Sequence, residues 1–74
     1  MYLVTRKQKI VQNGNVIEFE DSRRLLDLSP AENLAESIRR DELALGGLPY
    51  GPNKVVFETP TFYRSVTVTI EEVS

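Results

Sequence analysis

Hydrophobic and polar residues alternate along both flanks of the chain, whereas the middle of the chain has helical periodicity. Alternation is typical of a half-buried β-strand, and apolar spacings of three and four are typical of a helix with one apolar face. Alternation marks residues 2–20 and most of residues 54–73, with the helical stretch between them. The pattern therefore predicts two β-hairpins separated by a single helix.

Asn13-Gly14 divides the first flank into the two strands of a hairpin. A type I′ turn needs positive φ at both central residues, and Asn-Gly meets that need. This turn predicts Ile10 opposite Ile17 on one face, joined there by Phe19. On the same register we expect three pairs of opposite charge: Lys9 with Glu18, Lys7 with Glu20, and Arg6 with Asp21. Such exposed pairs contribute at most about 1 kcal/mol each, so they specify the register more than they stabilise it.

Residues 21–28 are predicted to form a loop with at most one helical turn. A helix is predicted over Ser29–Leu45, because Ser29 and Glu32 have the spacing of a capping box and Pro30 suits a first helical position. One stripe at helical spacing holds its apolar residues: Ala31, Leu34, Ala35, Ile38 and Leu45. Gly46-Gly47 is expected to end the helix with a left-handed cap.

Two further strands are predicted, at residues 54–58 and 62–73, with Thr59-Pro60 between them. Residues 46–53 are predicted to form a loop, since they hold three of the four glycines and two of the four prolines. The expected fold is one α+β domain covering residues 1–74. Its elements would follow the order ββαββ, giving a four-stranded, mostly antiparallel sheet with one helix packed on one face.

The amino-acid composition excludes several kinds of catalytic and metal-binding site. The chain has no Cys and no His, so it lacks disulfides, thiolate metal sites, the commonest metal ligand and the usual general base. Asp41-Glu42 and Glu71-Glu72 are adjacent in sequence, and neighbouring side chains on a helix or strand diverge. We interpret these four carboxylates as solvated charges. The chain is predicted to be non-enzymatic, with no metal and no cofactor.

Charge and hydropathy indicate a cytoplasmic protein. The net charge of −2 and the pI near 5.0 argue against a dedicated duplex-DNA binder, which usually carries a basic surplus. No apolar run approaches the roughly 20 residues of a membrane span. The first apolar run ends at Thr5-Arg6-Lys7, so no signal peptide is expected. The absence of Cys fits a reducing compartment.

Nucleic-acid association is the alternative from a different functional class. Tyr2 or Tyr63 would supply stacking for such a site. Its basic residues would be Arg6, Arg23, Arg24, Arg39 and Arg40. Lys7 and Lys9 are expected to face glutamates, however, and cross-strand pairing is therefore the favoured role for these charges.

Protein binding is the function that we predict for the chain. One helix would leave the second sheet face open, with Val11, Val16, Val56, Thr67 and Thr69 on it. Leu48 and Tyr50 lie on the Pro/Gly-rich loop, and Tyr is a frequent interface anchor. For Leu48 the favoured position is docked against the helix end. For Tyr50 the sequence favours neither a docked nor an exposed position. Exposed sheet edges would also accept a strand from a partner. The partner would be a second copy in a homodimer, or a larger assembly that the protein assists or inhibits, as proteins encoded by phages and mobile elements often do.

Overall fold

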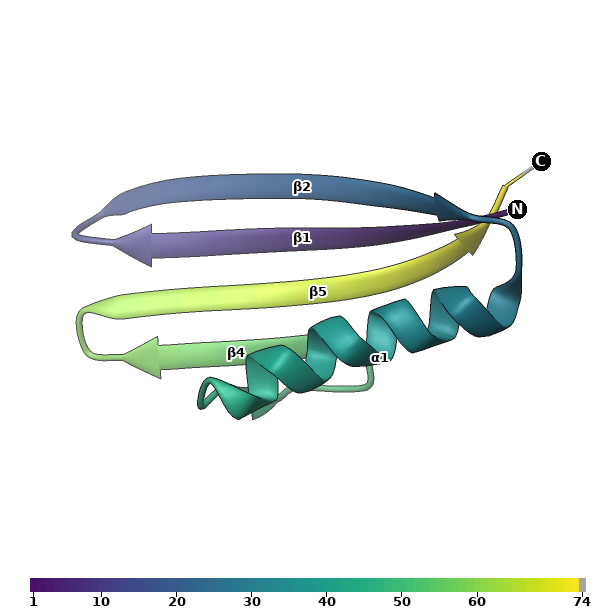
Figure 1. Ribbon diagram of the computed structural model, residues 1–74. Helices are drawn as coiled ribbons and strands as arrows, with labels where there is room; N and C mark the ends of the chain where they lie inside the picture. Colours follow the sequence, from purple (N-terminus) through teal and green to yellow (C-terminus); the bar gives the residue numbers. More distant parts are fainter. Residues whose placement is uncertain (74) are drawn as a thin grey trace.

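The computed structural model describes residues 1–73, which form an antiparallel sheet with one helix on one face (Figure 1). In chain order the elements are β1 (Tyr2–Gln12), β2 (Asn15–Leu25), α1 (Leu28–Ala44), β3 (Leu48–Pro49), β4 (Lys54–Thr59) and β5 (Phe62–Glu72). The sheet order is β2-β1-β5-β4-β3. The predicted α+β class is confirmed. The sheet has five strands rather than four, because Leu48-Pro49 leaves the predicted loop and pairs with Val55 and Val56.

The first hairpin has the predicted register. Asn13 and Gly14 have φ values of 53° and 79°, as a type I′ turn requires. Ile10 lies opposite Ile17, and the three predicted charge pairs are cross-strand neighbours. Only Arg6–Asp21 among them closes to an ion pair, at 3.0 Å. The two lysine–glutamate pairs therefore lie opposite each other in the predicted register but do not form ion pairs.

β2 continues to Leu25 and α1 begins at Leu28, so the loop predicted at residues 21–28 is confined to residues 26 and 27. Arg6 donates two hydrogen bonds to the Asp21 carboxylate, at 3.0 and 3.3 Å. The hydroxyls of Thr5 and Ser22 are 3.0 Å apart and share a hydrogen bond. The polar side chains of this segment therefore satisfy one another across the ladder, and the ladder extends instead of ending.

The core lies where α1 crosses β1 and β5. Val4, Val66 and Val68 from the sheet pack with Ala31 of the helix, and all four are buried. The predicted stripe is correct for Ala31, Leu34, Ala35 and Ile38, which all contact this cluster. It is wrong for Leu45, which is 71% exposed because the helix ends at Ala44.

The sequence predicts the C-terminal end of α1 correctly but not the cap at its N-terminal end. The N-cap is Asp27, with no side-chain cap hydrogen bond, and Ser29 already lies inside the helix. The predicted Ser29–Glu32 capping box is therefore absent. At the other end, Gly46 has φ 102° and its N–H donates to the Leu43 carbonyl, while the N–H of Gly47 donates to the Glu42 carbonyl. These two bonds make a Schellman cap, which confirms the predicted helix stop.

The helix is shorter than the sheet that it covers. α1 has 17 residues, about 25 Å at the rise of an α-helix. β1 and β2 have 11 residues each, about 36 Å at the rise of a strand. Figure 1 shows α1 beginning beside the chain termini and ending before it reaches the two hairpin turns. The hairpin end of this face therefore remains open, with Ile17 50% and Phe19 54% exposed. The helix therefore covers only part of the sheet face on which it packs.

Candidate functional site at the edge strand

β2 is a long edge strand of the sheet, and its five charged side chains are the only protection that its sequence supplies. It pairs with β1 on one side, and none of residues 1–73 forms a strand on its other side. Its register is continuous over 11 residues, with no Pro and no bulge, and every residue before Leu25 is exposed. Natural sheets usually shield such edges with Pro, bulges or a covering segment, because a free edge templates pairing with another chain. β2 is therefore the first candidate for a binding site.

The turn determines which backbone groups of β2 are free. In a two-residue hairpin turn the residues on either side of the turn, Gln12 and Asn15, form a hydrogen-bonded pair. Hydrogen-bonded and non-hydrogen-bonded pairs then alternate along an antiparallel ladder. The odd-numbered residues of β2 therefore bond to β1. The N–H and C=O groups that point outward belong to Val16, Glu18, Glu20, Ser22 and Arg24.

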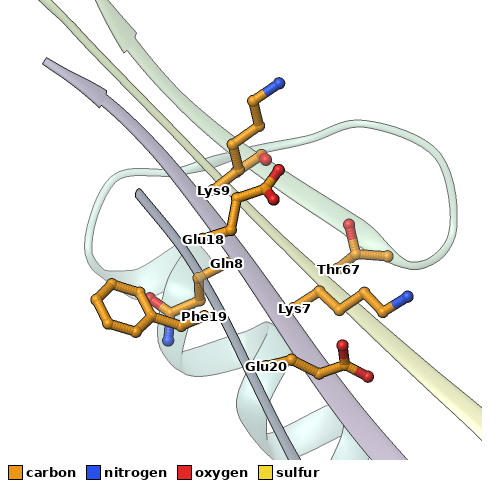
Figure 2. A pocket seen from close by; sticks show the side chains of 8 residues that line it. Lys7, Gln8, Lys9, Glu18, Phe19, Glu20 and Thr67 are labelled. Carbon is orange, nitrogen blue, oxygen red and sulfur yellow. The ribbon is translucent and has the colours of Figure 1, made fainter. Parts of the chain in front are cut away.

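Beside this free edge lie apolar side chains that α1 does not reach. Ile17 and Phe19 are on the helix side of the sheet, because their partners Ile10 and Gln8 alternate with the lysines of β1. Figure 2 shows Phe19 and Gln8 on one side of the strands, away from the lysines and glutamates. A hollow of about 350 Å³ next to Phe19 is lined by Arg6, Gln8, Phe19, Glu20 and Asp21.

A second hollow continues along β2 toward the helix. It measures about 370 Å³, and Leu34 and Ile38 of α1 form one wall. The opposite wall comes from β1 and β2: Val4, Arg6, Asp21, Ser22 and Arg23. Together the two hollows form a groove along the helix side of β2, in which apolar side chains lie among charged ones; the apolar side chains are Val4, Phe19, Leu34 and Ile38.

The other sheet face holds the side chains that the sequence analysis assigned to partner binding. The ladders place Val11, Val16, Val56, Thr67 and Thr69 on the face opposite α1, as predicted. Val11 and Val16 lie beside the turn, whereas Val56 pairs with Leu48 at the opposite edge. Between them is a polar depression of about 410 Å³ lined by Lys7, Gln8, Lys9, Glu18, Phe19, Glu20, Ser65 and Thr67 (Figure 2). The predicted set therefore shares a face without forming one apolar surface.

Leu48 and Tyr50 are both exposed. Leu48 is 71% exposed and belongs to β3, so the predicted docking against the helix end is wrong. Strand pairing with Val56 holds its backbone away from that position. Tyr50 is 70% exposed, and the Lys54 ammonium lies 5.7 Å from the centre of its ring. This loop remains a second, smaller surface with apolar side chains.

The arginines of the nucleic-acid alternative are not gathered in one place. Arg6 is bound to Asp21, and both Arg39 and Arg40 form ion pairs with Glu36. The Arg39 Nε is buried without a hydrogen-bond partner, and the Arg39 side chain as a whole is 31% exposed. Arg23 and Arg24 point to opposite faces of β2, since neighbouring strand residues alternate. No continuous basic surface results from these five side chains.

Glu42 is not the solvated charge that the sequence predicts. It is 6% exposed and accepts two hydrogen bonds from Arg64 of β5, at 2.6 and 3.1 Å. Arg64 also donates to the Gln8 side chain at 3.0 Å and stacks 5.2 Å above the Phe57 ring. The available signal was the position of Glu42, four residues after Ile38 on the buried stripe. This cluster joins α1 to β5 and β1, and its role is structural.

The described residues contain no group of three or more His, Cys, Asp or Glu side chains that would hold a metal ion. Within the same residues, no helix is long and apolar enough to cross a membrane. Comparisons with family models, with curated proteins and with solved structures found no significant match for this chain.

Proposed function

We propose that this chain is a small, non-enzymatic protein-binding module whose partner binds along the β2 edge. One observation carries the proposal. β2 is an exposed 11-residue edge strand, and it presents Ile17 and Phe19 on a stretch of sheet that α1 does not reach. A strand added to this edge would satisfy the outward N–H and C=O groups of β2 and cover the Phe19 ring.

The loop around Leu48 and Tyr50 is a weaker candidate for the main contact. β3, which carries Leu48, is a two-residue strand, so the edge on that side of the sheet offers little backbone for pairing. β2 offers a continuous ladder and aromatic area together, and aromatic side chains are typical anchors of interfaces. We therefore assign the main contact to β2.

The proposed biological setting is that of an accessory or inhibitor protein acting in the cytoplasm, of the kind that phages and mobile elements encode. This setting is supported by the small size of the chain and its lack of Cys, rather than by the site. A module of this kind would act by occupying or bridging a surface of its partner.

Phe19→Lys tests the proposed contact. The immobilised wild-type protein is expected to retain a specific partner, and Phe19→Lys is expected to lose it, because the new charge would be desolvated where the ring was. Leu45→Lys is the matched control, since Leu45 is also exposed and lies beyond the end of α1. Equal retention by the wild type and Phe19→Lys would show that the β2 edge is not the contact.

A further inference from the structure

We infer that the partner of the β2 edge is a second copy of this chain, whose β2 pairs antiparallel with the first around a two-fold axis at Ser22. This inference rests on the proposed function and names the occupant of that edge. The order of charges along β2 supports it: Glu20 and Asp21 are acidic, Ser22 is neutral, and Arg23 and Arg24 are basic. An antiparallel copy places the basic block of one strand opposite the acidic block of the other.

Backbone geometry limits the registers that are available. Two edges can bond only when residues with outward N–H and C=O groups meet. On β2 these are the even-numbered residues, so an even residue must face an even residue of the second copy. A two-fold axis at Ser22 meets this condition, with Ser22 facing Ser22, and Glu20 facing Arg24 of the second copy.

The remaining pairs of this register are complementary in charge and polarity. Asp21 faces Arg23 of the second copy, and the two-fold axis repeats this pair and the Glu20–Arg24 pair. On the groove side, Phe19 faces Leu25 of the second copy, which covers part of an exposed ring with an apolar side chain. Cross-strand pairs of these kinds contribute roughly 0.2–1 kcal/mol each. Within one chain, Arg23 and Arg24 form none of the ion pairs found among the described residues.

Neighbouring registers are unfavourable. Moving the axis by one or two residues places a charged residue opposite itself, at Glu20, Asp21, Arg23 or Arg24. Like charges directly opposite each other destabilise a ladder. The register centred on Ser22 is therefore selected over its neighbours by the same charges that keep unrelated strands away from the edge.

A charge-exchange experiment on the full chain tests the inference. The two-fold axis repeats the Glu20–Arg24 pair, so Glu20→Arg or Arg24→Glu alone makes two repulsive pairs in its dimer. In a mixed dimer of the two variants, opposite charges face each other again in both pairs. Sedimentation should show a wild-type dimer, and each variant alone should have a dissociation constant at least about tenfold higher. An equimolar mixture should recover a 1:1 dimer.

Glu18→Arg is the register control. Glu18 lies outside the paired residues when the axis is at Ser22, but it faces Arg24 when the axis is at Asp21. Glu18→Arg alone should dimerise as the wild type does, and mixing it with Arg24→Glu should yield no preferred 1:1 dimer, because that mixed dimer keeps one repulsive pair of carboxylates. A weakened Glu18→Arg dimer that Arg24→Glu restores as a 1:1 dimer would overturn the Ser22 register. A wild-type protein that stays monomeric at high micromolar concentration would overturn the dimer itself.

The outcome for the dimer is separable from the outcome for the proposed function. A monomeric wild type that still loses a captured partner on Phe19→Lys would contradict the second copy as occupant and leave the β2 edge as the contact. Monomeric behaviour together with unchanged capture by Phe19→Lys would contradict both proposals.

Discussion

Arg64 and Glu42 form a bidentate ion pair beneath the last turn of α1, with hydrogen bonds of 2.6 and 3.1 Å between guanidinium and carboxylate. Their side chains are 20% and 8% exposed. The pair joins strand β5 to the helix at the place where the apolar stripe of α1 ends. It also separates the closed core from the open end of the same sheet face, where Ile17 and Phe19 lie.

Removing one partner of this pair should destabilise the fold strongly. Arg64→Met leaves the Glu42 carboxylate buried without its donor, and Glu42→Leu leaves the Arg64 guanidinium without its acceptor. Each change is expected to lower the free energy of unfolding by about 3 kcal/mol. The double variant should recover much of that loss, because a buried ion pair and an apolar pair of similar volume are often nearly equivalent. Urea unfolding measures all three, and nearly neutral single variants would show that water shields the pair.

Gly47 should tolerate no side chain. A Cβ at this position would lie 2.3 Å from Cγ1 of Val55 and 2.9 Å from the Phe57 ring. Gly47→Ala should therefore cost about 1–3 kcal/mol in unfolding free energy, the range for overpacking a core. A Gly47→Ala protein as stable as the wild type would contradict the steric account.

Ser29→Ala should be almost neutral. A Ser that caps a helix typically contributes about 1 kcal/mol, but Ser29 lies within α1 and the N-cap is Asp27. A change below about 0.5 kcal/mol in thermal or urea unfolding is expected, as for other exposed substitutions. A loss near 1 kcal/mol would instead support the capping box that the sequence suggests.

Ile17→Lys and Phe19→Lys should leave the monomer folded. Both side chains are about half exposed, so replacing either should change the unfolding free energy by less than about 1 kcal/mol when measured on dilute protein. Val66→Ala provides the contrast, since Val66 is 1% exposed and its loss opens a cavity. A large loss for Phe19→Lys in dilute protein would mean that the ring belongs to the core.

The sequence predicted the hairpin register correctly because one turn determines it. Asn13-Gly14 admits a two-residue turn, and every later pair follows from that start. The alternation also assigned Ile17 and Phe19 to the correct face. It did not predict that they stay exposed, because alternation says which way a side chain points and not how far another element extends over it. The length of α1 relative to β2, and the direction in which it crosses the sheet, decide that outcome.

The other discrepancies arise from contacts between residues that lie far apart in the sequence. The hairpin register predicts the Arg6–Asp21 pair, but local propensity places Asp21 and Ser22 in a loop. β2 runs through both residues because Arg6 and Thr5, 15 and 17 positions earlier, lie directly across the ladder. Glu42 is buried because Arg64 on a distant strand lies opposite it. Long-range partners of this kind are not visible in any local pattern.

The central claim is that β2 is a binding edge occupied by a second copy. Amide hydrogen exchange on β2 tests this claim most directly. In dilute protein the amides of Glu20, Ser22 and Arg24 should exchange fast, because they point away from β1. At concentrations where the protein associates they should become protected, while Val16 and Glu18 remain fast at both concentrations. Fast exchange of Glu20, Ser22 and Arg24 in the associated protein would contradict the account.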